Sequence, residues 1–306
     1  MSSKPSDKPR TAVFITGGTG FVGSKIVDAI RRDHHVRMLV RPGSRPPVLA
    51  GVDVVEGDVT DRERLRGQME GCDTVVHLVG IIEEHGSVTF DAVINQGTQH
   101  VVAEAKDSGV TRFVHMSALG AQRNPNYGYH TAKFASEEAV TNSGIDFTIF
   151  RPSVIFGKGD GFITVLAGVV KNFPLIPIVG SGKALFQPVQ IDDVADSFAK
   201  AVNDPEGTSN KTFELGGARP YTYEEMIDTI AAKLGKKKPK VHVPLPLMKL
   251  VVRFSEPLPR ALRPPVTSEQ LKMLSLDNST AHSATRELLG REPVALEDGI
   301  DYLLSN

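Results

Sequence analysis

Short apolar runs alternate with segments of helical periodicity through the first half of the chain. The runs predicted to be strands cover residues 11–16, 36–40, 52–55, 74–78, 112–116 and 147–150. The segments predicted to be helices cover residues 21–32, 61–70, 89–108 and 129–142. Because parallel strands need a crossover connection, which is usually a helix, this alternation predicts a parallel sheet. Continuously apolar strands indicate that both faces of the sheet are covered. The predicted fold is therefore α/β, a doubly wound parallel Rossmann sheet that binds ligands beyond the carboxyl ends of its strands.

The alternation stops after about residue 155. Glycine and proline interrupt residues 157–161 and 174–182, and helices predicted at 192–203 and 222–234 are separated by isolated short strands. We therefore predict a Rossmann core over residues 1–155. Residues 156–306 are predicted to form mainly a smaller C-terminal α+β cap on the substrate cleft, with some segments returning to the core.

The cap contains a basic turn at residues 236–240 and six prolines within residues 244–265. Those prolines surround an apolar stretch, residues 245–254, which carries Lys249 and Arg253. The favoured interpretation of this stretch is a lid that packs on the substrate cleft. The alternative is a peripheral membrane contact, which would make a quinone or another lipid a natural partner.

Composition narrows the class of protein. Hydrophobic residues make up 40% of the 306 residues and charged residues 23%, which is typical of globular proteins. With 35 basic and 36 acidic residues, no net field favours nucleic acid as a partner. The single cysteine, Cys72, and the absence of metal-ligand spacing predict no disulfide framework and no metal site. The first ten residues lack an apolar signal region, and no apolar run is long enough to span a membrane, so we expect a soluble cytoplasmic protein.

A glycine-rich loop, residues 16–23 with the sequence TGGTGFVG, directly follows the first predicted strand and opens a helix. In its GxxGxxG spacing, Gly17 permits a tight turn, Gly20 lets backbone amides approach a pyrophosphate, and Gly23 lets the helix lie close to the strand. The free N–H groups of the helix start would hold the anion. The loop residues predicted to bind a dinucleotide are Gly17, Thr19, Gly20, Phe21, Val22 and Gly23. The alternative is a glycine-rich turn that binds nothing.

The end of the second strand indicates which dinucleotide binds. Sites for NAD usually place an Asp or Glu residue there, and its carboxylate accepts hydrogen bonds from the ribose hydroxyls. This chain has Arg41 instead, followed by Arg45. We predict that Arg41 pairs with a 2′-phosphate or stacks on adenine, so NADP(H) is favoured over NAD(H). Arg45 is interpreted as a solvated residue. Asp58 and Val59, after the third strand, are expected beside the adenine, where Asp58 would accept a hydrogen bond from the amino group or would cap the next helix.

Tyr129 and Lys133 lie four residues apart on a predicted helix and therefore share one face. A nearby ammonium group stabilises a phenolate, so we expect Lys133 to lower the pKa of Tyr129. Such a pair would donate a proton beside a carbonyl that takes a hydride. By itself the Tyr-x-x-x-Lys spacing is a weak signal, because many such pairs lie on helix surfaces.

The position of this pair, between the fifth and sixth strands and downstream of the glycine loop, resembles the extended type of the short-chain dehydrogenase/reductase superfamily. Residues 115–121 (HMSALGA), 151–160 (RPSVIFGKGD) and 186–194 (FQPVQIDDV) resemble its atypical subgroup, which includes the Rossmann-fold accessory subunit of respiratory complex I and bacterial relatives. The resemblance implies an NAD(P)-dependent oxidoreductase with Tyr129 and Lys133 as its catalytic pair, Lys133 also holding the nicotinamide ribose. The further cofactor contacts that it implies are Leu78, Val79 and Gly80 at the ribose, and Pro152, Ser153 and Val154 at the nicotinamide carboxamide.

One position departs from the family pattern. Typical members carry Ser or Thr after the fifth strand to bind the substrate oxygen, and alignment places Ala118 there, while a shift of one residue restores Ser117 as a catalytic residue.

The sequence therefore leaves two main hypotheses for the function. The first is an oxidoreductase that transfers a hydride between NADP(H) and a carbonyl or alcohol carbon of an apolar small molecule. The alternative is a non-catalytic nucleotide-binding module with a structural, redox-sensing, assembly or quinone-related role. A sugar-nucleotide epimerase is less favoured, because no second nucleotide site is evident.

Overall fold

The computed structural model describes residues 12–124, 126–255, 271, 272, 274 and 276–305. The prediction that the N-terminus lacks a signal segment concerns residues outside this range. Thr11 of the first predicted strand also lies outside it, as do residues 256–265 of the proline-rich segment, which include four of its six prolines.

The predicted doubly wound parallel sheet is confirmed, and it has one strand more than expected. Its seven strands have the order β11-β6-β5-β4-β1-β2-β3, and every neighbouring pair is parallel. The additional edge strand, β11, comes from the second half of the chain. The bounds are β1 Ala12–Thr16, β2 His35–Val40, β3 Val52–Glu56, β4 Thr74–His77, β5 Arg112–Met116, β6 Asp146–Pro152 and β11 Lys211–Leu215.

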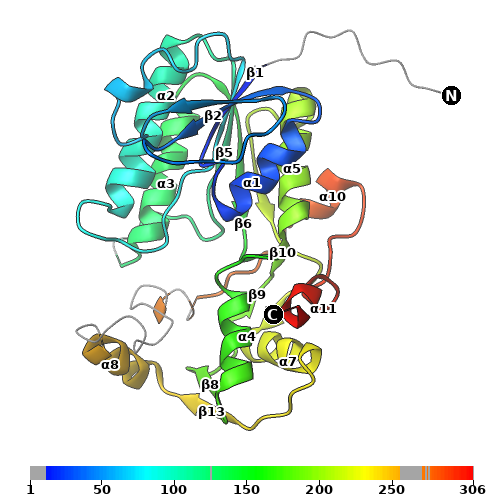
Figure 1. The fold of residues 1–306 in the computed structure, drawn as a ribbon. Coiled ribbons are helices and arrows are strands. Elements are labelled where there is room, and N and C mark those ends of the chain that lie inside the picture. Colours follow the sequence, from blue (N-terminus) through cyan, green and yellow to red (C-terminus); the bar gives the residue numbers. More distant parts are fainter. Residues whose placement is uncertain (1–11, 125, 256–270, 273, 275, 306) are drawn as a thin grey trace, which may run out of the picture.

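Helices cover both faces of the sheet (Figure 1). On one face, α1 (Phe21–Ile30) and α5 (Ile191–Asn203) pack on Val13 and Ile15 of β1. On the other face, α2 (Gly97–Asp107) and α3 (Gly128–Thr141) pack around Phe14 of the same strand. Alternate residues of each continuously apolar strand therefore enter two separate cores.

Two predicted helices differ in the structure. Residues 61–70 form only a 3₁₀ turn, Glu63–Leu65, so the predicted helix is wrong. The left-handed backbone of Gly67, at φ +72°, ends the turn, and its N–H donates to Glu104 on α2 instead of continuing a helix. Residues 89–108 form the predicted helix from residue 91 onward. It begins as a π-helical segment, Asp91–Gln96, in which the Asp91 carboxylate accepts hydrogen bonds from the amides of Asn95 and Gln96.

Most of the rest of the second half forms a smaller unit beyond the carboxyl edge of the sheet (Figure 1). Helices α4 and α7 pack together with two-stranded pairs around a core of their own that includes Phe156, Leu166, Ile178 and Met226. The strands are β7 Ile155–Phe156, β8 Ile176–Val179, β9 Leu185–Phe186, β10 Val189–Gln190, β12 Tyr221–Thr222 and β13 Lys240–Val243. The helices of this unit are α4 Ile163–Asn172, α7 Tyr223–Lys233, α8 Leu245–Ser255 and α11 Leu296–Gly299, with a 3₁₀ turn at Asp301–Leu304. Two short helices lie with the core instead: α6 Pro205–Thr208 directly follows α5, and α10 Thr285–Leu289 packs against α5 (Figure 1).

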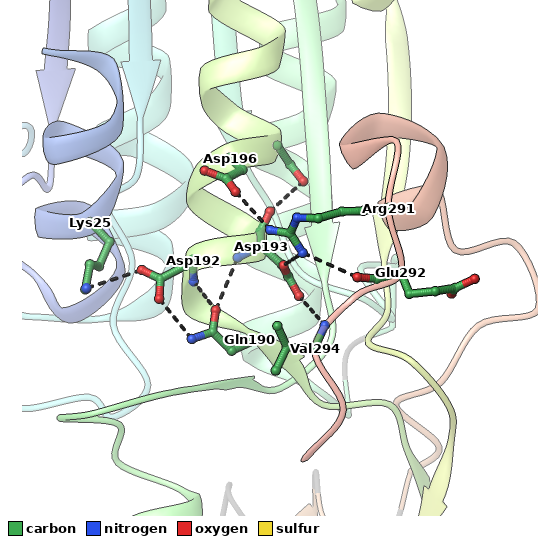
Figure 2. A network of polar contacts seen from close by, with 9 residues as sticks. Lys25, Gln190, Asp192, Asp193, Asp196, Arg291, Glu292 and Val294 are labelled. Atoms are coloured by element: carbon green, nitrogen blue, oxygen red, sulfur yellow. Dashed lines mark hydrogen bonds and ion pairs between the residues drawn. The ribbon is translucent and has the colours of Figure 1, made fainter. Parts of the chain in front are cut away.

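A polar network at the start of α5 fastens the C-terminal segment to the core (Figure 2). Buried Asp193 receives hydrogen bonds from Arg291 Nη1 at 2.6 Å and from the backbone N–H of Val294 at 2.8 Å. Asp192, the neighbouring residue, pairs with Lys25 of α1 at 3.2 Å. The network thereby connects the C-terminal chain through α5 to the helix that follows the glycine loop.

Candidate functional site

A cleft of about 1140 Å³ lies at the carboxyl edge of the sheet, and the glycine loop forms part of its wall. Gly17 has the left-handed φ of +76°, and a Cβ on it would lie 3.0 Å from the backbone carbon of Leu78. A Cβ on Gly23 would lie only 2.1 Å from the carbonyl oxygen of Gly17. Because no other residue tolerates this approach, the start of α1 lies directly on the turn that follows β1.

The start of α1 suits an anion. Gly20 occupies the N-cap position and provides no capping side chain, and the first turn contains no acidic residue. The first N–H groups of a helix have no intrahelical partner and carry a partial positive charge. Since Thr19, Gly20, Phe21, Val22 and Gly23 all line the cleft, this cradle fits the pyrophosphate of a dinucleotide.

The adenosine side of the cleft contains Arg41, Asp58 and Val59. Arg41 is exposed, and within the described part of the chain its guanidinium makes no hydrogen bond or ion pair; Arg45 does not line the cleft. Asp58 Oδ1 accepts from the backbone N–H of Thr60 at 2.9 Å and from its hydroxyl at 2.8 Å. Asp58 therefore caps a turn, not the predicted helix, and it also faces the cleft. Val59 is buried against Gly97 of α2.

Tyr129 and Lys133 both line the cleft from α3. Lys133 is buried, and its Nζ donates to the carbonyl oxygen of Met116, at the end of β5, over 2.8 Å. A Cβ on Gly80 would lie 3.3 Å from the same nitrogen, so the glycine makes room for the ammonium group. The ring of Tyr129 packs edge-on against Phe90, with centroids 5.8 Å apart.

Burial changes the protonation of this pair. It raises the pKa of Tyr129 to about 12 and lowers the pKa of Lys133 to about 8, although the nearby Glu137 carboxylate opposes the second change. The expectation that Lys133 lowers the pKa of Tyr129 is therefore wrong for this structure. The lysine donates to the Met116 carbonyl, and the pKa of Tyr129 is set mainly by the hydration that its phenolate form would lose. At neutral pH Tyr129 carries its proton.

Two stacked imidazoles, His77 and His115, lie behind the pair and are held neutral by burial. Thr98 gives its hydroxyl proton to the carbonyl of Ile94, so His77 Nε2 must donate to Thr98, and Nδ1 accepts from Thr16. Burial lowers the pKa of His77 to about 3. These contacts join the ends of β1 and β4 to α2, so the role of His77 is structural.

Among the described residues, no group of three or more His, Cys, Asp or Glu side chains is arranged to hold a metal ion.

Ser117 directly follows β5 and lines the cleft next to Ala118. Its side chain is buried, and within the described part of the chain its hydroxyl has no hydrogen-bond partner. A buried hydroxyl without a partner is costly, so the hydroxyl is suited to a ligand that supplies one. The structure thus brings Ser117 to the same cleft as Tyr129 and Lys133.

Leu78, Val79, Gly80, Pro152, Ser153 and Val154 also line the cleft. Ser153 and Val154 are held by Asn278, which sequence reasoning missed: the Ser153 hydroxyl lies 2.7 Å from two Asn278 oxygens, and the Val154 N–H donates to Asn278 Oδ1 at 2.9 Å. No local signal identifies Asn278, which lies 125 residues beyond Ser153. His130, interpreted from the sequence as structural or exposed and on a different helix face from Tyr129, is buried and also lines the cleft.

The part of the cleft near the cap is apolar. We define this apolar lobe as Ile81, Ile82, Val88, Phe162, Val165, Leu166, Val179, Phe186, Tyr223, Leu274 and Leu276. The charged residue beside it, Asp277, accepts a hydrogen bond from the N–H of Leu185 at 2.8 Å. None of the described residues of α8 lines the cleft, so the prediction that residues 245–254 form a lid over it is wrong.

Comparison with known proteins defines the class. The chain matches the NAD(P)H-binding family over residues 17–205 and belongs to it. It is 30% identical over 242 residues to the ceramide reductase of Caulobacter vibrioides, covering 78% of this chain and 75% of that protein. It is 29% identical over 344 residues to the 3 beta-hydroxysteroid dehydrogenase/Delta 5-->4-isomerase of Mycobacterium tuberculosis H37Rv, covering 96% and 90%.

A third relative agrees with the predicted subgroup. The mitochondrial NADH dehydrogenase [ubiquinone] 1 alpha subcomplex subunit 9 of Arabidopsis thaliana is 26% identical over 274 residues, covering 87% of this chain and 68% of that protein. The resemblance to atypical short-chain dehydrogenase/reductases is thereby confirmed.

Solved structures share the fold. The NADPH-dependent quinone oxidoreductase QOR2 of Escherichia coli, complexed with NADPH, superposes with a TM-score of 0.73 at 19% identity, covering 95% of this chain and 99% of that chain. A nucleoside-diphosphate-sugar epimerase of Staphylococcus aureus gives 0.76 at 21% identity, covering 95% and 100%. Within the described residues, no helix is long and apolar enough to cross a bilayer.

The depressed pKa of Lys133 predicts a pH dependence of folding stability. Between about pH 8 and pH 10.5 the unfolded chain binds a proton at Lys133 that the folded chain does not, so stability rises with pH in this window. Relative to Lys133→Met, the wild-type free energy of unfolding should increase by ~2 kcal/mol between pH 7.5 and 10, as measured by urea denaturation. The matched control is Lys106→Met, which changes an exposed lysine on α2. A constant difference for Lys133→Met would contradict the buried ammonium.

Proposed function

We propose that this protein is an NADP(H)-dependent oxidoreductase that acts on a carbonyl or alcohol group of an apolar small molecule. The observation that carries the proposal is the continuity of one cleft. It joins the glycine cradle, the Tyr129–Lys133 pair with the unpaired hydroxyl of Ser117, and the apolar lobe.

Each polar residue at the centre of the cleft has a role in this proposal. The nicotinamide, when bound, supplies or accepts the hydride at its C4 atom. Ser117 donates a hydrogen bond to the substrate oxygen, and Tyr129 transfers a proton to it. The phenol of Tyr129 is protonated at neutral pH, which is the form that can donate a proton to a carbonyl oxygen. Lys133 holds the nicotinamide ribose and stabilises negative charge that develops on Tyr129.

The substrate class is inferred from the apolar lobe and from relatives. Among the described residues that line the cap end of the cleft, none has a cationic side chain that could pair with the phosphates of a second nucleotide. Two relatives named above, the ceramide reductase and the 3 beta-hydroxysteroid dehydrogenase, are named for lipid substrates. Both observations support an apolar substrate over a sugar nucleotide.

The preference for NADP(H) rests on Arg41, which lines the cleft directly after β2, and on the lack of an acidic residue at the end of that strand to bind the ribose hydroxyls. In Arg41→Ala, NADPH binding followed by nicotinamide fluorescence should weaken about 10–100-fold, while NADH binding changes less than threefold. The matched control is Arg45→Ala, which should leave both affinities unchanged. Equal losses for NADPH and NADH, or tighter NADH binding by the wild type, would contradict the preference.

A second candidate is a non-catalytic module that holds the dinucleotide for a structural or redox-sensing role. The relative from respiratory complex I favours it, since its name describes a subunit of a larger assembly. The two candidates differ in what they require of Tyr129, because a module needs the shape of its ring but not its hydroxyl.

Removal of the Tyr129 hydroxyl separates the candidates. With NADPH and a panel of apolar ketones and quinones, Tyr129→Phe should lower kcat at least ~100-fold and leave the NADPH affinity within twofold. Tyr127→Phe, which changes a tyrosine outside the cleft lining, should keep wild-type turnover. If wild-type protein binds NADPH tightly and reduces no compound in the panel, the oxidoreductase proposal is wrong and the module is favoured.

A further inference from the structure

Helix α8 presents an apolar stripe to solvent. Leu247, Leu250, Val251 and Phe254 are 51%, 50%, 47% and 71% exposed. Their spacing of i, i+3, i+4 and i+7 places all four on one face of the helix. Val252, which points away from this face, is buried, so the helix is anchored on one side and apolar on the other. Single exposed hydrophobic residues are ordinary, but a contiguous stripe on one helix indicates an interaction surface.

The apolar surface continues beyond α8. Phe173 and Leu175, just before β8, and Val241 on β13 are each about half exposed. Strands β8 and β13 pair in parallel, and α8 follows β13 after Pro244. In Figure 1 these three elements lie together at the end of the molecule farthest from the central sheet. We call the four residues of the stripe together with Phe173, Leu175 and Val241 the cap-end surface.

Unpaired positive charge is found on the same end. Lys236, Lys237 and Lys249 are exposed and, within the described residues, make no ion pair or side-chain hydrogen bond. Their neighbours are engaged, since Lys240 pairs with Glu224 and Asp228, and Lys238 donates to the carbonyl oxygens of Lys171 and Phe173. Lys249 lies on the side of α8 opposite the stripe. Lys236 and Lys237 directly precede Lys238, which bonds to the carbonyl oxygen of Phe173, so they lie near the Phe173 and Leu175 part of the cap-end surface. Their ammonium groups beside an apolar surface complement a partner that is negative outside and apolar beneath.

The cap-end surface also adjoins the cleft. Val179 lines the apolar lobe and is the register partner of Val243 on β13, and the carbonyl of Val243 accepts from the N–H of Gly180 at 2.9 Å. Helix α8 begins two residues after Val243, at Leu245. The helix is therefore connected by a short rigid path to the wall of the apolar lobe.

We propose that the cap-end surface docks on an anionic lipid bilayer, and that docking brings the apolar lobe to the membrane from which an apolar substrate is taken. The stripe of α8 enters the boundary between headgroups and acyl chains, while Lys236 and Lys237 contact lipid phosphates. The source of the substrate rests on the proposed function, whereas the docking itself does not.

The test is sedimentation of the purified full-length protein with vesicles of phosphatidylcholine and phosphatidylglycerol in a 3:1 ratio, and with vesicles of phosphatidylcholine alone. Wild-type protein should bind the anionic vesicles at least about tenfold more tightly, and raised salt should weaken that binding. Leu250→Glu combined with Phe254→Glu should abolish binding. Lys236→Gln combined with Lys237→Gln should weaken it by about fivefold per lysine removed.

Matched variants identify the surface. The first control, Val48→Glu, changes a fully exposed apolar residue of the Rossmann unit. The second, Lys106→Gln combined with Lys183→Gln, removes two exposed lysines outside the cap-end surface. Both variants should bind vesicles like the wild type. NADPH binding should persist in every variant, which shows that each folds and separates a failure of docking from a failure of the proposed function. Three results would overturn the proposal: no binding of wild type to anionic vesicles, equal binding by the Leu250→Glu/Phe254→Glu variant, or a lipid-free dimer that this variant dissociates.

Discussion

The close approach of Gly23 to the carbonyl oxygen of Gly17 is the contact on which the rest of the site depends. It places the start of α1 directly on the turn after β1, so that uncapped N–H groups face the cleft. The same turn lies against the backbone of Leu78, which positions the segment after β4. The Lys25–Asp192 pair then connects α1 to α5, and Arg291 connects α5 to the C-terminal segment (Figure 2). Thus the contact that forms the anion cradle also fixes the helix through which the C-terminal chain is attached.

At the centre of the cleft, desolvation and hydrogen bonding determine the protonation states of Lys133 and Tyr129. Lys133 is held by the Met116 carbonyl with a lowered pKa, and Tyr129 keeps its proton because its environment disfavours the phenolate. Asn278 comes from the far end of the sequence and binds Ser153 and Val154, so the C-terminal segment sets the position of the chain after β6. One asparagine therefore connects the segment predicted to contact the nicotinamide with the C-terminal part of the chain.

Sequence reasoning succeeded where local chemistry determines structure. The alternation of apolar runs predicted the doubly wound sheet, and the glycine spacing located the turn after β1, because both patterns act over a few residues. It failed where contacts from distant parts of the chain determine the local structure. The helix predicted at 61–70 is lost to Gly67 and its bond to Glu104, the edge strand β11 is recruited from the second half of the chain, and Asn278 has no signal near Ser153. The pKa of Tyr129 was predicted in the wrong direction because spacing shows that Lys133 is near but not how deeply the phenol is buried. For α8, the sequence suggested a lid on the cleft or a peripheral membrane contact, and only the packing shows that its described residues do not line the cleft.

The measurement that tests the account most directly is the NADPH dissociation constant of Gly23→Ala, followed by nicotinamide fluorescence, with far-UV circular dichroism to show that the variant folds. The control is Gly168→Ala, which adds the same methyl group to helix α4, where nothing lies within 4 Å. If the glycine contact forms the dinucleotide cradle, Gly23→Ala should weaken NADPH binding at least ~30-fold, and Gly168→Ala should match the wild type. Equal affinity in a folded Gly23→Ala protein would contradict the central claim, because the anion would then not be held where the start of α1 meets the turn after β1.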